Sequence, residues 1–99
     1  MISGSQCRAG RALAELSRDI LARLSNVDVA TIEAFERQLG KPSNDEIEAI
    51  QRGLEEAGIV FIAENGGGVG VRLKFTASEA RRLAVLESEG GIAALDDVP

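Results

Sequence analysis

Arginine and carboxylate side chains are the main groups in this sequence that could take part in catalysis or binding, because it contains no histidine, tyrosine or tryptophan. Histidine is the usual acid–base catalyst near neutral pH and a common metal ligand. The single cysteine, Cys7, excludes an internal disulfide and a multi-cysteine zinc site. No nucleophile–base pair can be assembled from what remains. We therefore expect no enzyme activity, no metal and no other cofactor.

Three further patterns favour structural roles over reactive ones. The acid pairs Asp45-Glu46, Glu55-Glu56 and Asp96-Asp97 have neither a partner base nor the spacing of a calcium loop, which indicates solvated faces. The triple glycine at 66–68 lacks the lysine and spacing of a phosphate-binding loop, and it is typical of a hairpin tip. Cys7 lies on a predicted inward helix face, which favours a small buried hydrophobe over a redox sensor.

The arginines are concentrated in the first forty residues. Five of them balance five acids there, so this stretch is neutral although the whole chain carries a net charge of −5. Residues 41–75 contribute −2 and residues 76–99 contribute −3. An acidic chain does not bind nucleic acid through bulk charge. Any such binding is therefore expected from the first forty residues.

Helix-start signals divide that stretch and the next into four predicted helices. Capping pairs are expected at Ser3 with Gln6 and at Ser43 with Glu46, and Ser17 and Asp28 are further N-cap candidates. Gly40 with Pro42, and then Gly58, are expected to end the third and fourth helices. The residues predicted to face inward are Cys7, Gly10, Leu13, Ile20, Leu21, Leu24, Ile32, Phe35, Leu39, Ile47, Ile50 and Leu54.

A β-hairpin is predicted after the fourth helix. The apolar run 59–63, the turn 65–68 and the alternating segment 69–75 indicate two strands with one buried face. Thr76 and Glu79 then predict a fifth helix, followed by a short acidic tail. We expect a helical bundle at 1–58, a hairpin at 59–75 and a C-terminal helix and tail at 76–99. The hairpin edge is a candidate dimer interface, through Val69, Val71, Leu73 and Phe75.

The segment LSRDILARLSNVDVATIEAFER, residues 16–37, resembles the lambda-repressor-like (XRE, Cro/CI-type) helix-turn-helix. The match includes Ala22 in the second helix, Val27 after the turn, and the ATI..FE pattern from Ala30 to Glu36. It extends to small bacterial regulators with a "GQCRAARALL"-like opening and an "AGVxFIxENGGGxGVRL"-like hairpin. The corresponding residues here are 5–13 and 57–73.

The resemblance implies a fold and a function. The fold is mainly α, a lambda-repressor-like helix-turn-helix bundle of four to five helices with a C-terminal β-hairpin. The function is that of a small cytoplasmic regulator of transcription that binds double-stranded operator DNA as a homodimer. The third helix enters the major groove. The residues placed at the base edges are Asp28, Val29, Ala30, Glu33, Ala34 and Arg37, and Arg18 is placed at a phosphate.

Arg8, Arg11 and Arg23 are further candidates for phosphate contacts, with a solvated helix face as the alternative for Arg8 and Arg11. Similar regulators usually carry serine-arginine at Asp28-Val29 and arginine at Glu33. The acidic and apolar residues here leave a second function open. In it the helix-turn-helix binds another protein, as an antagonist or co-regulator of another transcription factor.

No apolar run approaches the length of about 20 residues needed to span a membrane, and the N-terminus lacks the basic start of a signal peptide. We therefore expect no membrane association.

Overall fold

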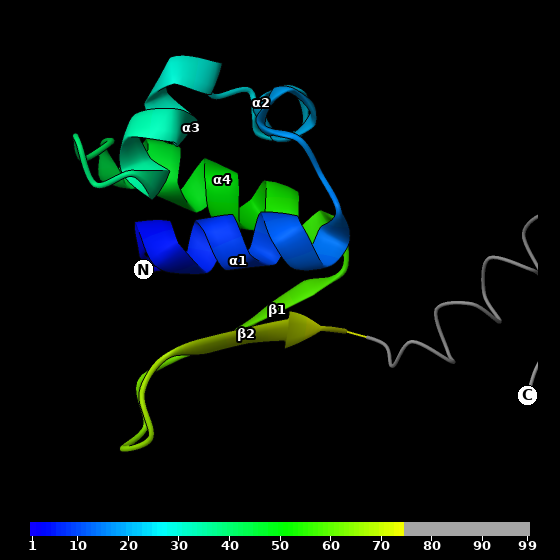
Figure 1. Ribbon diagram of the computed structural model, residues 1–99, viewed down its shortest axis with the longest axis vertical. Helices are drawn as coiled ribbons and strands as arrows, with labels where there is room; N and C mark the ends of the chain where they lie inside the picture. The colour runs from blue at the N-terminus through cyan, green and yellow to red at the C-terminus, as the bar shows by residue number, and fades with distance from the viewer. Residues whose placement is uncertain (75–99) are drawn as a thin grey trace, which may run out of the picture.

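A computed structural model describes residues 1–74 of the chain and shows a small helical bundle closed by a β-hairpin (Figure 1). Its helices are α1 (Gly4–Ala14), α2 (Arg18–Ser25), α3 (Val29–Glu36) and α4 (Asn44–Glu56). Its strands are β1 (Ile59–Ile62) and β2 (Gly70–Leu73). The mainly helical prediction with a hairpin is confirmed. The predicted fifth helix and Phe75 lie outside the described residues.

The helices begin where local side-chain chemistry predicts. At α1, the Ser3 hydroxyl accepts from the Gln6 N–H at 3.1 Å while the Gln6 side chain accepts from the Ser3 N–H at 2.9 Å. Ser43 and Glu46 form the same reciprocal pair at the start of α4. Ser17 caps α2 through the N–H of Ile20. Each cap satisfies backbone donors that the helix itself leaves unpaired.

The core lies where α1, α2, α3 and α4 meet. Its most completely buried side chains come from every helix and from β1: Cys7, Leu21, Ile32, Ile47, Ile50, Leu54 and Ile59. Val27 and Ile32 are both buried on either side of the start of α3, as expected for a hydrophobic staple. The apolar stripe predicted for α4 is confirmed in full, because Ile47, Ile50 and Leu54 are all buried.

Four residues predicted to face inward are exposed instead: Leu13, Ile20, Leu24 and Leu39. On α2 only a narrow stripe, Leu21 and Ser25, is covered by its neighbours. Ile20 points about 100° away from Leu21 around the helix, which takes it out of that stripe. Leu39 is 70 % exposed because α3 ends at Glu36, short of the predicted Gly40, and Gln38 adopts a left-handed conformation with φ 59°. The chain therefore leaves the helical repeat before it reaches Leu39.

The hairpin packs under α1. Its strands are antiparallel, with Ile59 opposite Leu73 and Phe61 opposite Val71, and both strands are shorter than the predicted 59–63 and 69–75. A Cβ atom at Gly10 would lie in ordinary van der Waals contact with Ile59 and Phe61, so α1 runs directly along the sheet at this point. The Gln6 side-chain amide also donates to the carbonyl of Gly70 at 3.0 Å.

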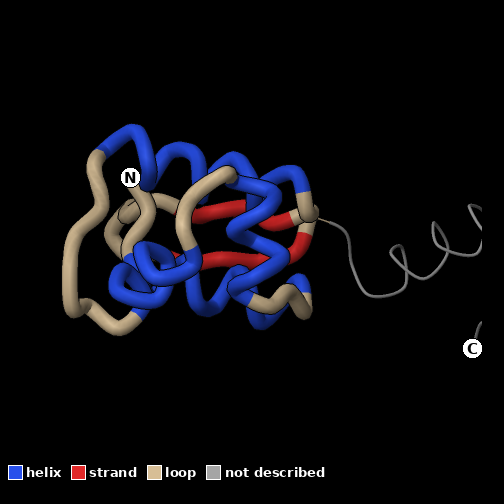
Figure 2. Tube along the Cα trace, turned by 90° about the horizontal axis from the view of Figure 1, so that it is seen from above, coloured by secondary structure: helices blue, strands red, loops and turns tan. Residues whose placement is uncertain are grey.

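The elements form three layers. The hairpin lies on one side of α1 and α4, and α2 and α3 lie on the other side (Figure 1). Figure 2 shows the two strands side by side beneath the helices. The α2–α3 unit thus lies at the end of the molecule opposite the hairpin.

None of the helices in the described part of the chain is long and apolar enough to cross a membrane.

Candidate nucleic-acid interface

Two eight-residue helices, α2 and α3, are joined by the three residues Asn26 to Asp28. Asn26 ends α2 in a left-handed conformation with φ 60°, which asparagine tolerates better than most residues. The buried Ser25 hydroxyl donates to the Leu21 carbonyl at 2.7 Å and accepts from the Val27 N–H at 3.3 Å. The Ser25 hydroxyl therefore connects the end of α2 to the turn, which sets the direction in which α3 leaves α2.

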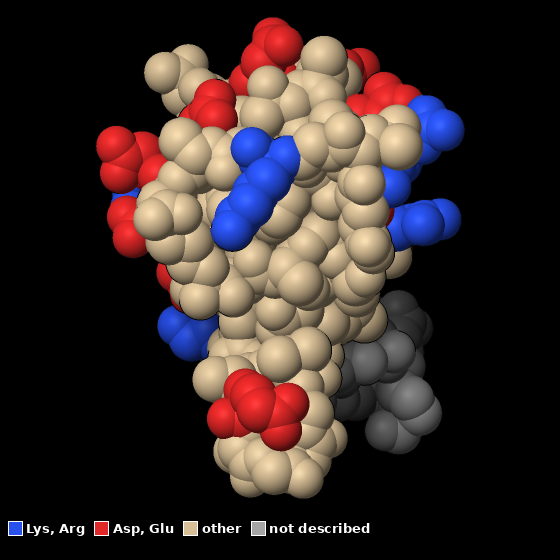
Figure 3. Space-filling model, turned by 90° about the vertical axis from the view of Figure 1, so that its left-hand side faces the viewer, with Lys and Arg blue, Asp and Glu red and all other residues tan. Residues whose placement is uncertain are grey.

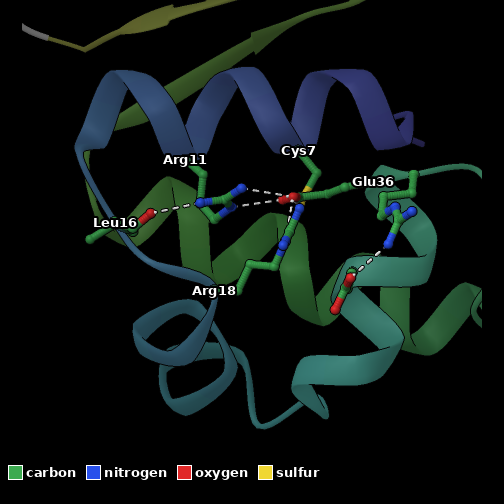
Figure 4. Close-up of polar contacts among 7 residues, drawn as sticks. Cys7, Arg11, Leu16, Arg18 and Glu36 are labelled. Atoms are coloured by element: carbon green, nitrogen blue, oxygen red, sulfur yellow. Dashed lines mark hydrogen bonds and ion pairs between the residues drawn. The ribbon is translucent and has the colours of Figure 1, made fainter.

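Glu36, the last residue of α3, accepts three side-chain donors from other elements (Figure 4). Arg11 of α1 binds it through two nitrogens, Nε to Oε2 and Nη2 to Oε1, both at 2.8 Å. Arg18 of α2 donates from Nε to Oε1 at 3.0 Å, and the Cys7 thiol donates to Oε2 at 3.1 Å. The Glu36 side chain is 0 % exposed. We call these four residues the Glu36 cluster, and they connect α3 to both α1 and α2.

The protonation of the Glu36 cluster follows from its contacts. Burial alone raises the pKa of a carboxyl group, but the hydrogen bonds from Arg11, Cys7 and Arg18 outweigh that effect and lower the pKa of Glu36. Burial, together with the neighbouring carboxylate, raises the pKa of the Cys7 thiol. Glu36 is therefore ionised and Cys7 is a neutral donor. A neutral, fully buried thiol matches the structural role predicted for Cys7.

The predicted base-contacting residues occupy the outer side of α3 and its N-terminus. Asp28, Ala30 and Arg37 are exposed, while Val29, Glu33 and Ala34 are half-buried. Asp28 occupies the N-cap position of α3, as predicted, but its side chain makes no capping hydrogen bond. The Arg37 guanidinium donates to the Glu33 carboxylate at 3.0 Å, so these two charges partly neutralise each other.

The four arginines predicted to contact phosphates differ in how far they are engaged inside the protein. Arg8 and Arg23 are exposed. Arg11 instead points into the Glu36 cluster, and its Nη1 also donates to the Leu16 carbonyl at 3.0 Å. All three Arg11 nitrogens are thus engaged inside the protein, and we withdraw Arg11 from the set of phosphate contacts. Arg18 bonds Glu36 through Nε alone and keeps 31 % of its side chain exposed at the first residue of α2.

Charge around the turn is mixed. Three acids at the surface, Asp19, Asp28 and Glu33, accompany the two arginines Arg23 and Arg37. Figure 3 shows one face of the molecule, on which Lys and Arg side chains are scattered among Asp and Glu side chains and uncharged areas. Binding to DNA through this surface would therefore depend on a few placed contacts more than on a basic field.

Two features of the interface were not predicted from the sequence. One is the Glu36 cluster, because a buried carboxylate with arginines from two other helices has no local pattern. The other is Lys41, which is exposed in the loop after α3 and lines a shallow depression together with Ala30 and Ala34. The signal for Lys41 was present in the sequence as a lone cation between Gly40 and Pro42.

The predicted dimer residues lie on or beside β2. Val71 and Leu73 are half-buried, packed against the core, while Val69 is 56 % exposed just before the strand. Phe75 is not among the described residues. Within residues 1–74, no group of three or more His, Cys, Asp or Glu side chains is arranged to hold a metal ion.

No protein-family model matches the chain, and a search of curated proteins also returned no match. The function proposed below therefore depends on the geometry of this interface and on the sequence resemblance described above.

Proposed function

We propose that the chain is a small helix-turn-helix regulator of transcription, with a lambda-repressor-like fold, that binds operator DNA as a dimer. The arrangement of α2 and α3 carries this proposal. Two short helices joined by a three-residue turn lie at one end of the molecule, and α3 presents its outer side to solvent. A helix held in this way is of the right size to enter the major groove.

Three side chains on the outer side of α3, those of Val29, Ala30 and Ala34, are small, which favours a close approach to the bases. Val29 and Ala30 fit against thymine methyl groups, and Glu33 is an acceptor suited to the amino group of cytosine. Arg37, one helical turn from Glu33, holds that carboxylate at 3.0 Å. The expected readout therefore relies on methyl contacts and one acceptor, with little of the arginine–guanine contact common in other DNA-binding proteins.

Cations around this surface supply the phosphate contacts. Arg8 and Arg23 are exposed, and Arg18 offers the terminal part of its guanidinium next to the N-terminus of α2. Backbone N–H groups at a helix N-terminus favour an adjacent phosphate. Lys41 extends this set on the other side of Ala30 and Ala34. These contacts would position α3 without reading sequence.

A pair of matched alanine substitutions tests this proposal. Ala30→Asp places a carboxylate on the groove-facing side of α3, and Ala63→Asp places one at an exposed position after β1, at the far end of the molecule. Fluorescence anisotropy with a duplex from the region upstream of the chain's own gene is expected to show binding weakened at least tenfold for Ala30→Asp, about 1.4 kcal/mol. Ala63→Asp should bind like the unmodified protein. Equal affinities for the two variants would contradict a role for α3 in the groove.

The acids near the turn favour a second candidate function, binding to another regulatory protein. Asp28 and Glu33 oppose approach to a phosphate backbone, and the exposed Ile20 and Leu24 share one side of α2. Substitution Glu33→Arg separates the two functions. If the unmodified chain shows no binding to the upstream duplex even at low salt and Glu33→Arg restores it, the surface has lost DNA binding and the protein-interaction function is favoured.

A further inference from the structure

The outer edge of β2 carries backbone groups that are turned away from β1. The Lys74 N–H donates to the Gly58 carbonyl at 2.7 Å, which makes Gly58 and Lys74 a hydrogen-bonded pair. In an antiparallel ladder such pairs alternate with pairs whose backbone groups point outward. The pairs of the outward kind, whose backbone N–H and C=O groups point away from the partner strand, are therefore Ile59 with Leu73 and Phe61 with Val71.

This edge is open in the described part of the chain, where the sheet has only two strands. The Leu73 carbonyl accepts from the exposed Arg72 guanidinium at 3.1 Å, a local contact at the surface. Exposed strand edges are templates for pairing with another strand. The side chains beside the edge are apolar: Val71 and Leu73 project from the same face and pack against the core, and Val69 is exposed just before the strand.

We propose that β2 pairs with β2 of a second copy, antiparallel and in one register, with Val71 opposite Val71 and Val69 opposite Leu73. The inference rests on the proposed function in that a dimer reads two half-sites. This register joins the outward-pointing groups of both copies, because Val71 and Leu73 are both of the outward kind. The neighbouring register, centred on Arg72, would place two guanidiniums directly opposite each other, and like charges in that position are destabilising.

Charges along the hairpin also match in this register. Arg72 lies opposite Gly70 of the second copy, and Lys74 lies opposite its Gly68. The Glu64 carboxylate accepts from the Gly68 N–H at 3.1 Å, so it sits beside that position. The basic end of each β2 is thus placed next to the acidic tip of the other hairpin. Cross-strand pairs of opposite charge stabilise a sheet modestly.

The symmetry of this pairing suits a DNA-binding dimer. The two-fold axis that relates antiparallel neighbours within one sheet runs perpendicular to that sheet. In the structure, α1 and α4 and then α2 and α3 are stacked on one side of the hairpin along this direction (Figure 1). Both copies of α3 would consequently lie on the same side of the four-stranded sheet. Pairing through an exposed helix on the flank of the molecule would not ensure this.

Disulfide trapping tests the register directly. In a Cys7→Ser background, which keeps a hydrogen-bond donor to Glu36, Gly70→Cys and Arg72→Cys are made as separate proteins. The substituted positions lie on the outer face of the hairpin, and a side chain at Gly70 meets only ordinary contacts with Ile62. Mild oxidation of the mixture should give a covalent dimer of Gly70→Cys with Arg72→Cys. Arg72→Cys alone should remain largely uncrosslinked, whereas self-crosslinking would overturn the register.

Sedimentation equilibrium tests the interface without cysteines. Four-residue strands bury less area than a typical tight interface, so we expect dimerisation to need micromolar concentrations. At those concentrations the measured mass should be twice the chain mass of 10.4 kDa. Val69→Lys should raise the dissociation constant at least tenfold. Ala63→Lys is the matched control, since Ala63 is exposed across the hairpin on the other edge. A monomer at every concentration, or equal effects of the two lysines, would overturn the proposal.

The outcomes also separate this inference from the proposed function. A monomer that still binds the upstream duplex would remove the β2 interface and leave DNA binding by α3 standing. A dimer with the expected crosslinking pattern that binds no DNA would support the interface and contradict the proposed function.

Discussion

Glu36 determines how α3 sits on the rest of the protein. Its carboxylate is fully buried and receives donors from Arg11, Arg18 and Cys7, which belong to α1 and α2. A buried carboxylate is costly unless its charge is paired and its oxygens are hydrogen-bonded. Here both oxygens are engaged, so the cluster acts as a polar clamp at the end of α3. The residue that positions the proposed DNA-binding helix therefore need not touch DNA.

Removing the charge of Glu36 should destabilise the fold. Glu36→Gln keeps the size of the side chain but leaves two arginines facing a neutral amide in a largely buried site. We expect a loss of roughly 2 to 4 kcal/mol in the free energy of unfolding, measured by urea denaturation. Glu33→Gln on the same helix is the control, because its ion pair with Arg37 is exposed and such pairs contribute about 0.5 kcal/mol. Similar losses for both variants would contradict the importance of the buried cluster.

Acid should weaken the same cluster. Glu36 has a lowered pKa in the folded protein, whereas in the unfolded chain it titrates near about 4.3. The unfolded chain therefore binds more protons in this range, and the stability contributed by Glu36 is present above about pH 4.3 and is lost as the pH falls through the folded pKa. Urea denaturation at pH 7, 5 and 3 should show a smaller drop for Glu36→Gln than for the unmodified protein. Parallel drops would indicate that other carboxylates carry the acid sensitivity.

At the residue scale the residues predicted to contact bases all lie outside the buried core, three of them exposed and three half-buried, but the use of the arginines was not predicted. Arg11 looked like a phosphate contact because charge and spacing alone do not show where a long side chain points. Its true partner, Glu36, lies 25 residues away in the chain. Pairing over such a separation depends on how α1 and α3 pack, which is a property of the assembled fold.

The contact between α1 and α3 depends on Gly4 at the start of α1. A Cβ atom there would collide with the backbone carbonyl of Phe35, which cannot move away as a flexible side chain can. Gly4→Ala should consequently separate the two helices and lower stability by about 2 kcal/mol, seen as a lower melting temperature in circular dichroism. Ser5→Ala, at the exposed next position, should change it little. A Gly4→Ala protein as stable as the Ser5→Ala protein would contradict this close approach.

The left-handed conformation of Asn26, in the turn between α2 and α3, can be tested by substitution. Asn26 has φ 60°, a conformation that is strained for most residues because of their Cβ atom. Glycine has no Cβ atom and adopts it freely. Asn26→Gly should be close to neutral, and Asn26→Ala should cost about 1 kcal/mol. Melting temperatures of the two variants provide the measurement. If alanine is tolerated as well as glycine, the left-handed turn is not what constrains α3.

At the element scale, helix starts were predictable and helix ends were less so. The caps at Ser3, Ser17 and Ser43 involve residues three apart, so the sequence contains all the information they need. The end of α3 depends on Gln38 adopting a left-handed conformation, which the sequence does not indicate, because the glycine expected to end the helix, Gly40, lies two residues further on. The exposed Ile20 and Leu24 have a similar origin, because the width of the buried stripe on α2 is set by its neighbours and not by α2 itself.

The two surfaces proposed for DNA binding and for pairing lie at opposite ends of the molecule (Figure 1). The α2–α3 unit lies at one end and the β2 edge at the other, with α1 and α4 between them (Figure 1). Such a layout allows a symmetric pair of chains to join through the hairpins while both copies of α3 face the same way. The net charge of −5 does not by itself oppose the proposed DNA binding, because residues 1–40 have a net charge of zero. Local acids on α3 are the more serious constraint.

A salt titration of binding to the upstream duplex tests DNA recognition by this protein most directly. Each phosphate contact contributes about 0.9 to the slope of log K against log salt. With Arg8, Arg18, Arg23 and Lys41 engaged in each copy of a dimer, the slope should be roughly −7. Arg23→Gln should make it shallower, with no loss of preference over an unrelated duplex of equal length. Undetectable binding at the lowest salt, or binding that does not respond to salt, would contradict the proposed function.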